Sequence, residues 1–143
     1  MIVYFDTSAI MPIVIDEPSS PAAARLWDEA DRVVSSRLVY AEGRAALAMA
    51  CRLKRIDERQ LRTAVEDFEL LTRQIDIVEV TKNLVLQAGA LAEQFDVRGC
   101  DAVHLASARL IDDPDVVLAA GDAHVLAAAQ VLGMAVAHLT SRP

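Results

Sequence analysis

A short run of β-branched and aromatic residues, 2–5, stands at the start of the chain and ends at a carboxylate, Asp6. Two hydroxyl residues, Thr7 and Ser8, follow it, and then apolar sequence of helical character. This pattern predicts a buried strand that presents Asp6 at its carboxyl end, with Thr7 or Ser8 capping the next helix. Ligands of α/β sheets bind at the carboxyl ends of the strands. Asp6 is therefore the first candidate functional residue.

Strand-like and helix-like segments alternate along the rest of the chain. We expect further strands at 33–35, 75–80, 116–120 and 134–138, and helices at 9–15, between a turn at 16–21 and residue 31, and at 36–53, 57–72, 81–95, 102–111 and 123–132. Such alternation predicts an α/β fold of three layers, α/β/α, with a mostly parallel central sheet. No repeat, low-complexity stretch or linker divides the 143 residues, so we expect a single domain over 1–143.

The composition narrows the class of protein. Hydrophobic residues make up 54% of the chain and aromatic residues only 4%, which favours helices packed closely on a sheet over a β-sandwich. No apolar stretch approaches the roughly 18 residues of a membrane span. The N-terminus has no basic region before an apolar core, so we expect no signal peptide. Two distant cysteines without a CxxC pattern suit a reduced, cytoplasmic protein.

The formal net charge of −7 argues against a protein that holds nucleic acid by charge alone. It conflicts less with nucleic-acid binding if several acids are metal ligands, because bound divalent cations offset their charge. Whether the net charge argues against nucleic-acid binding therefore depends on whether the acids cluster at a metal site.

Four acids occupy matching places in the predicted fold. Asp6 and Asp122 each end a buried strand and precede a helix, whereas Glu42 and Asp101 each lie in or at the first turn of a mostly apolar helix. Parallel strands bring their carboxyl ends, and the starts of the following helices, to one edge of the sheet. All four carboxylates can therefore meet in one cleft.

Glu42 lies where a carboxylate is unexpected. The predicted inward stripe of its helix consists of Leu38 or Val39, Glu42, Ala45 or Ala46, Met49 and Leu53. A lone carboxylate on an apolar face is costly unless it is paired, protonated or bound to a metal. The simpler alternative is a glutamate at the rim of the stripe, paired with Arg44 or another arginine.

Four neighbouring carboxylates repel one another, and without a cation some of their pKa values should rise. Carboxylate oxygens without histidine or cysteine partners favour Mg²⁺ or Mn²⁺. A water on such an ion is the nucleophile in metal-dependent phosphodiester hydrolysis, and two ions about 4 Å apart stabilise both the attacking and the leaving oxygen. The residues alone thus predict a carboxylate-only metal site with phosphoryl chemistry, holding one ion or two.

Four segments resemble the four acidic motifs of PIN-domain nucleases, in order and at similar spacing: Phe5 to Ala9, Ser35 to Glu42, Cys100 to Ala106 and Ala120 to Asp122. The similarity spans nearly the whole chain and is greatest to the VapC-like toxins of bacterial toxin–antitoxin pairs. It implies a PIN fold and a Mg²⁺-dependent endoribonuclease in which Mn²⁺ can substitute. It also implies an RNA substrate, a homodimer and a cognate antitoxin that covers the cleft.

Carried over residue by residue, the resemblance implies four catalytic and metal-binding acids: Asp6, Glu42, Asp101 and Asp122. Ser8 resembles the hydroxyl residue that supports the first acid, and we expect Thr7 to assist there. His104 resembles a histidine frequent at the third motif, for which we expect a structural or supporting role rather than metal ligation. One position departs from the family pattern. Ala120 stands where Thr or Ser is common, so we expect a hydrogen bond that orients Asp122 to be missing.

The window 52–62 is the only clearly basic stretch of this acidic chain. Arg52, Arg55 and Arg59 within it are candidates for contacts with RNA phosphates, although a solvated helix face is the simpler explanation. Arg98 and Arg44 are further candidates, either for RNA contact or for neutralising the acids. The net negative charge predicts weak non-specific RNA binding, so we expect selectivity to come from RNA shape and a local basic surface.

Two other classes of function remain open. One is a catalytically weak PIN-like subunit that only binds a partner, which four intact acids disfavour. The other is different Mg²⁺-dependent phosphoryl chemistry. A receiver-like domain needs a lysine after a late strand, but the lysines are Lys54 and Lys82. A phosphatase of the haloacid-dehalogenase type needs a second aspartate at the position that Ser8 occupies.

Overall fold

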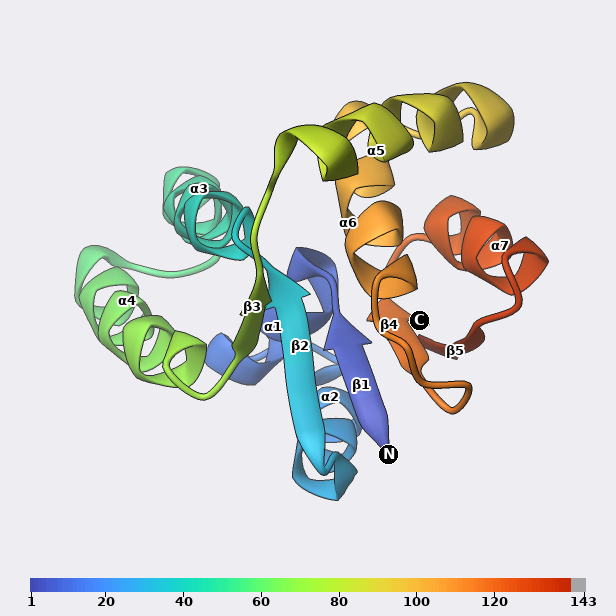
Figure 1. Cartoon of the computed structure of the whole chain (residues 1–143). Coiled ribbons are helices and arrows are strands. Elements are labelled where there is room, and N and C mark those ends of the chain that lie inside the picture. The colour runs from blue at the N-terminus through green and yellow to red at the C-terminus, as the bar shows by residue number, and fades with distance from the viewer. Residues whose placement is uncertain (140–143) are drawn as a thin grey trace.

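The apolar run 2–5 forms β1 (Ile2–Phe5), the central strand of the sheet. The computed structural model describes residues 1–139, and within them the sheet has five strands in the order β3-β2-β1-β4-β5. The other strands are β2 (Arg32–Ser36), β3 (Asp76–Val78), β4 (Val117–Ala120) and β5 (Ala135–His138). Every neighbouring pair is parallel, so the carboxyl ends of these strands lie at one edge of the sheet (Figure 1).

Helices cover both faces of this sheet (Figure 1). One face is covered by α1 (Thr7–Val14), α2 (Ser20–Glu29), α3 (Val39–Arg52) and α4 (Glu58–Thr72), and the other by α5 (Lys82–Phe95), α6 (Gly99–Arg109) and α7 (Ala123–Val131). Because strand side chains alternate, Val3 and Phe5 join the core with α1–α4, whereas Tyr4 joins the core with α5–α7. The predicted three-layer α/β/α fold with a parallel sheet is confirmed.

The expected strands and helices are present, with ends that differ by a few residues. The cap of α1 is Asp6, whose side chain accepts the main-chain N–H of Ser8 at 2.8 Å. The expectation that Thr7 or Ser8 caps this helix is therefore wrong. Thr81 caps α5 as expected, because its hydroxyl oxygen accepts the N–H of Leu84 at 3.2 Å.

The buried side of α3 differs from the predicted stripe. It consists of Val39, Gly43, Leu47 and Ala50, while Met49 and Leu53 are exposed. Gly43 gives the reason, since a β-carbon built there would lie 2.2 Å from the ring of Phe68. Glycine carries no hydrophobic signal in a sequence, so the prediction missed the position where α4 approaches most closely. Glu42 consequently borders the buried face, with its side chain 30% exposed.

Two expectations from the composition concern the membrane and the thiols. Among residues 1–139, no helix combines the length and the apolar character that crossing a membrane requires. Cys51 and Cys100 are both free thiols, the first partly buried and the second exposed.

Candidate active site

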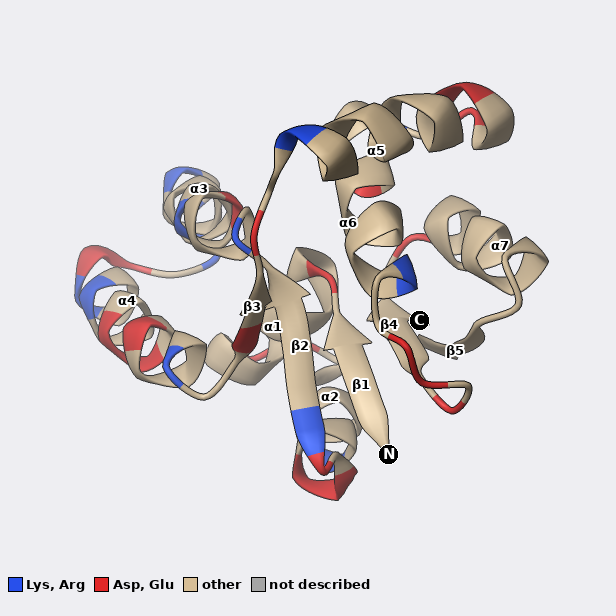
Figure 2. Ribbon diagram, in the orientation of Figure 1, with Lys and Arg blue, Asp and Glu red and all other residues tan. Residues whose placement is uncertain are grey.

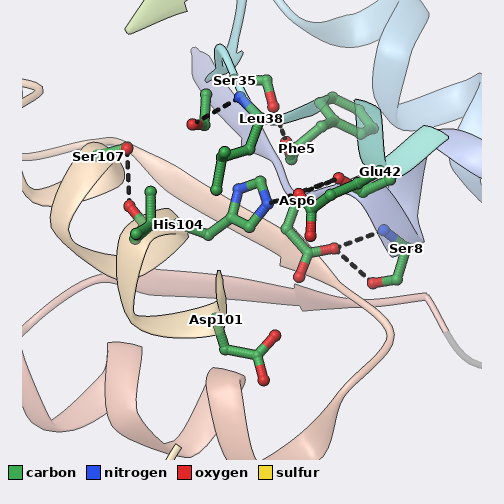
Figure 3. A network of polar contacts seen from close by, with 12 residues as sticks. Phe5, Asp6, Ser8, Ser35, Leu38, Glu42, Asp101, His104 and Ser107 are labelled. Carbon is green, nitrogen blue, oxygen red and sulfur yellow. Dashed lines mark hydrogen bonds and ion pairs between the residues drawn. The ribbon is translucent and has the colours of Figure 1, made fainter. Parts of the chain in front are cut away.

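Asp6 directly follows β1 and is only 5% exposed. Its Oδ1 accepts two hydrogen bonds from Ser8, one from the main-chain N–H at 2.8 Å and one from the hydroxyl (Figure 3). Burial raises the pKa of this carboxyl group above its ordinary value, although the nearby His104 and the Ser8 hydrogen bonds oppose the effect; the charge of Asp101 adds to it. The ionised form of Asp6 therefore gains from a nearby cation.

Ser8 connects Asp6 to the end of β4. Its hydroxyl oxygen accepts the main-chain N–H of Gly121 at 2.8 Å. The next residue, Asp122, caps α7, and its Oδ1 accepts the main-chain N–H of His124 at 2.8 Å. Within residues 1–139 this is the one hydrogen bond that orients the Asp122 side chain, and the fully buried Ala120 contributes none.

Asp101 lies in the first turn of α6, with its side chain 14% exposed. The carboxylate of Asp6 points toward it in Figure 3. Its Oδ2 accepts a hydrogen bond from Nε of Arg98 at 3.0 Å, and the Arg98 side chain is 82% exposed. The hydrogen bond and the charge of Asp101 raise the pKa of Arg98 above its ordinary value, and the charge of Asp122 adds to the effect. Together with its effect on Glu42, this places Arg98 within electrostatic reach of three of the four acids.

Glu42 lies in the first turn of α3 and makes contacts with two other elements. Its Oε1 accepts the hydroxyl of Thr7 at 2.9 Å and lies 2.6 Å from Nε2 of His104. Partial burial alone would raise the pKa of Glu42, but the hydrogen bonds from His104 and Thr7 and the charge of Arg98 bring it below its ordinary value. Glu42 is therefore held as a carboxylate, and His104, rather than Arg44, is its partner.

The four acids share one pattern. Each uses one oxygen in the hydrogen bonds described above, whereas the second oxygen accepts none from residues 1–139. Free carboxylate oxygens held in place by their neighbours are ligands that Mg²⁺ and Mn²⁺ prefer, so these residues fit a divalent ion. As the side chains lie, no three acidic, histidine or cysteine side chains of the described part are close enough to hold one ion. Their convergence on an ion stays a prediction.

Tyr4 is a site residue that the sequence interpretation missed. Its hydroxyl oxygen lies 2.7 Å from Nδ1 of His104, and both side chains are buried. A tyrosine in an apolar strand is typical of a core residue, so the sequence pattern gave no reason to single it out. The alternation of side chains along β1 does indicate its contact. It places Tyr4 on the face of the sheet that α6 covers, where His104 lies one helical turn after Asp101.

The predicted basic contacts fall into two places. Arg98 lies beside the acids, whereas the end of α3 at Arg52 is about 15 Å along the helix from Glu42. The basic residues on α3 and α4 lie on the side of the molecule away from α6 and α7 (Figure 2). Within the basic window, Arg55 pairs with Glu17 at 3.0 Å. Of the predicted arginines, Arg98 is the one placed at the acids.

Arg44 has partners away from the acids. Its guanidinium lies 3.6 Å from a carboxylate oxygen of Glu69 and 5.7 Å from the centre of the Tyr40 ring. It also donates to the Tyr40 hydroxyl at 2.7 Å. The expectation that Arg44 pairs with Glu42 is therefore wrong, because α4 supplies the carboxylate that Arg44 meets.

A parallel α/β/α domain with acids at the carboxyl edge of its sheet is the architecture of several metal-dependent enzymes. Comparison with known proteins shows to which family this chain belongs. A family model described as PIN domain matches residues 3–118. Ribonuclease VapC49 of Mycobacterium tuberculosis is 42% identical over 136 residues, which cover 95% of this chain and 94% of that protein. This chain belongs to the PIN-domain family, among its VapC members.

Solved structures share the fold at lower identity. Mycobacterium tuberculosis VapC20, described as a toxin that cleaves the sarcin–ricin loop, matches with a TM-score of 0.68 at 22% identity and covers 88% of this chain and 94% of its own. A toxin–antitoxin complex from Klebsiella pneumoniae matches with a TM-score of 0.63 at 15% identity, covering 87% of this chain and 90% of that one.

Proposed function

We propose that this protein is a Mg²⁺-dependent endoribonuclease, with Mn²⁺ as a substitute, and the toxin of a toxin–antitoxin pair. The observation that carries the proposal is the set of carboxylates that each have one oxygen oriented by the fold and one left free. A relative that shares 42% of its residues with this chain is named Ribonuclease VapC49, which supports RNA as the substrate. Hydrolysis of the phosphodiester bond would take place at Asp6, Glu42, Asp101 and Asp122.

The residues around the acids hold the site for this reaction. A divalent ion there would supply an acidified water as nucleophile and positive charge for the leaving oxygen. Ser8 fixes Asp6, and Thr7 fixes Glu42, so the free oxygen of each carboxylate needs little reorganisation. Arg98 is exposed beside Asp101, and its guanidinium suits a phosphate of the RNA strand.

The two groups of arginines have different roles in this proposal. Arg98 contacts the phosphate nearest the scissile bond, because it lies at the acids. Arg52 ends α3, about 15 Å along the helix from Glu42, and Arg55 and Arg59 follow it in the turn and at the start of α4. These three arginines contact a distant part of a long RNA. With a net charge of −7, the protein relies on these local contacts and on RNA shape for selectivity.

We also propose a cognate antitoxin and a homodimer. A structure with the same fold is described as a toxin–antitoxin complex, which supports a protein partner. An antitoxin that presents a basic side chain to the acids would exclude both the metal and the RNA, because it satisfies the same free oxygens. Light scattering of the purified chain, alone and with the antitoxin, measures both assemblies.

Cleavage of a pool of structured RNAs tests the proposed activity. The pool is incubated with the protein in Mg²⁺, in Mn²⁺ and in EDTA, and the Asp6→Asn variant is compared with the wild type. Asp67→Asn is the matched control, because Asp67 is an exposed acid of α4. Cutting that requires metal, persists in the control and vanishes in Asp6→Asn is the expected result. Cutting in EDTA, or by Asp6→Asn at the wild-type rate, would overturn the proposal.

A further inference from the structure

A chain of hydrogen-bonding groups runs from the core of the protein to Glu42. The Tyr4 hydroxyl oxygen is 2.7 Å from Nδ1 of His104, and Nε2 of the same ring is 2.6 Å from Oε1 of Glu42. Tyr4 is fully buried and His104 is 2% exposed, so water does not compete for either ring. The chain joins β1, α6 and α3, and its last member is a proposed ligand of the ion.

The positions of the protons follow from the partners. An ionised carboxylate can only accept hydrogen bonds, so Nε2 of His104 and the hydroxyl of Thr7 must both donate to Oε1 of Glu42. A neutral imidazole has one N–H, which leaves Nδ1 as an acceptor. The Tyr4 hydroxyl fits this acceptor, because a phenol O–H can donate and its oxygen lies 2.7 Å from Nδ1.

We propose that Tyr4 and His104 are positioning residues for Glu42. The Tyr4 hydroxyl donates to Nδ1 and so supports the Nε2–H tautomer of His104. This N–H, together with Thr7, holds Oε1 of Glu42 and leaves Oε2 free for a metal ion. The proposal rests on the proposed function, because it assigns Glu42 to the metal site. It adds two buried residues, neither of which touches the ion or the RNA.

A purely structural role makes a different prediction. The rings of Tyr4 and His104 meet edge to face, with centroids 5.8 Å apart, and this packing would survive loss of the tyrosine hydroxyl. Packing alone gives Nδ1 of His104 no hydrogen-bond donor. The hydrogen bonding of Nδ1 therefore separates positioning from packing, and it is measurable without any nuclease activity.

The first experiment is a long-range proton–nitrogen NMR spectrum of the three histidine rings at neutral pH, with His104 assigned by its loss in His104→Gln. We expect a single Nε2–H tautomer of His104 in the wild type, with Nδ1 at the nitrogen shift of a hydrogen-bonded acceptor. In Tyr4→Phe, Glu42 still holds Nε2–H, but the hydrogen-bond shift of Nδ1 should be lost. An Nδ1–H tautomer or a doubly protonated ring in the wild type would overturn the proposal. So would an Nδ1 shift that is unchanged in Tyr4→Phe.

Kinetics provide the second readout. Tyr4→Phe should lower kcat roughly ten-fold and leave KM unchanged, since RNA contacts are untouched. Tyr40→Phe is the matched control, because Tyr40 loses the same hydroxyl from a contact with Glu69 away from the acids. His104→Gln, whose amide can donate to Glu42, should keep more activity than His104→Leu. Equal kcat in Tyr4→Phe and Tyr40→Phe would overturn the positioning role, and absence of cleavage by the wild type would instead overturn the proposed function.

Discussion

The main-chain N–H of Gly121 donates to the hydroxyl of Ser8 across 2.8 Å, although 113 positions separate the two residues. The same hydroxyl donates to Asp6, so one oxygen atom ties the end of β1 to the end of β4. Ser8→Ala removes both bonds. We expect the cleavage rate to fall about 10–100-fold, and the free energy of unfolding to fall by about 1–2 kcal/mol. Single-turnover cleavage and urea denaturation measure the two effects.

Ser20→Ala is the control for this prediction. The Ser20 hydroxyl also accepts one main-chain N–H, from Glu17, and donates to one oxygen, of Ile15. Its loss should lower stability by a similar amount and leave cleavage unchanged, because it lies outside the site. A Ser8→Ala protein as active as Ser20→Ala would contradict the supporting role of Ser8.

Asp6→Asn should stabilise the protein while it abolishes cleavage. Burial raises the pKa of Asp6, so the folded protein binds this proton more tightly than the unfolded chain. The contribution of Asp6 to stability is therefore greatest at low pH and is lost as the pH rises from the ordinary aspartate value through the raised one. At neutral pH the ionised group opposes folding, and a neutral amide that still accepts from Ser8 removes this cost.

Thermal unfolding with and without Mn²⁺ checks the Asp6 prediction. Without metal at neutral pH, the Asp6→Asn variant should have the higher Tm. Added Mn²⁺ should raise the Tm of the wild type by mass action, and the rise should be smaller in the variant. A lower Tm for Asp6→Asn in the absence of metal would show that the ionised carboxylate stabilises the fold.

Gly43→Ala should destabilise the protein although alanine favours helices by about 1 kcal/mol over glycine. The new β-carbon would lie 2.2 Å from the buried ring of Phe68, and overpacking of this kind costs about 1–3 kcal/mol. Gly89→Ala in α5 is the control, because nothing lies within 4 Å of its β-carbon. Urea denaturation should show a loss for the first and a gain for the second, and a gain for both would place Phe68 elsewhere.

Arg98→Ala should weaken the binding of short RNA, measured without divalent ions. Loss of one phosphate contact to a single strand lowers the slope of log affinity against log salt by about 0.7. The double variant Arg55→Glu, Arg59→Glu should leave short RNA unaffected and weaken only long RNA, because its charges lie far from the acids. Short RNA that responds to the double variant and not to Arg98→Ala would reverse the two roles.

The sequence was most informative where a residue's place follows from the strand and helix periods. Asp6 and Asp122 were placed correctly after β1 and β4, because a buried strand that stops at a carboxylate is a local pattern. The buried side of α3 was misplaced, because Gly43 is recognised only once Phe68 from α4 lies against it. Contacts between distant segments set such positions, and no local pattern records them.

Partners of charged and polar side chains were the least predictable part of the site. Arg44 was offered as a partner for Glu42, yet α4 brings Glu69 to it. His104 was expected in a supporting role, but its partner Tyr4 was not expected at all. Both outcomes depend on which face of a helix packs against which strand. The sequence pattern predicts the rotation of a helix about its axis only to within about one residue.

The place of β1 in the sheet bears on when this protein can act. Its two neighbours are β2 and β4, and the second of these begins only at Val117. Until that stretch has left the ribosome, one side of β1 has no partner and Asp122 has not been made. Under the proposed function, an unfinished chain without β4 and Asp122 would leave the messenger and the ribosome that produce it intact. A premature stop before residue 117 would likewise yield a fragment that does not cleave RNA.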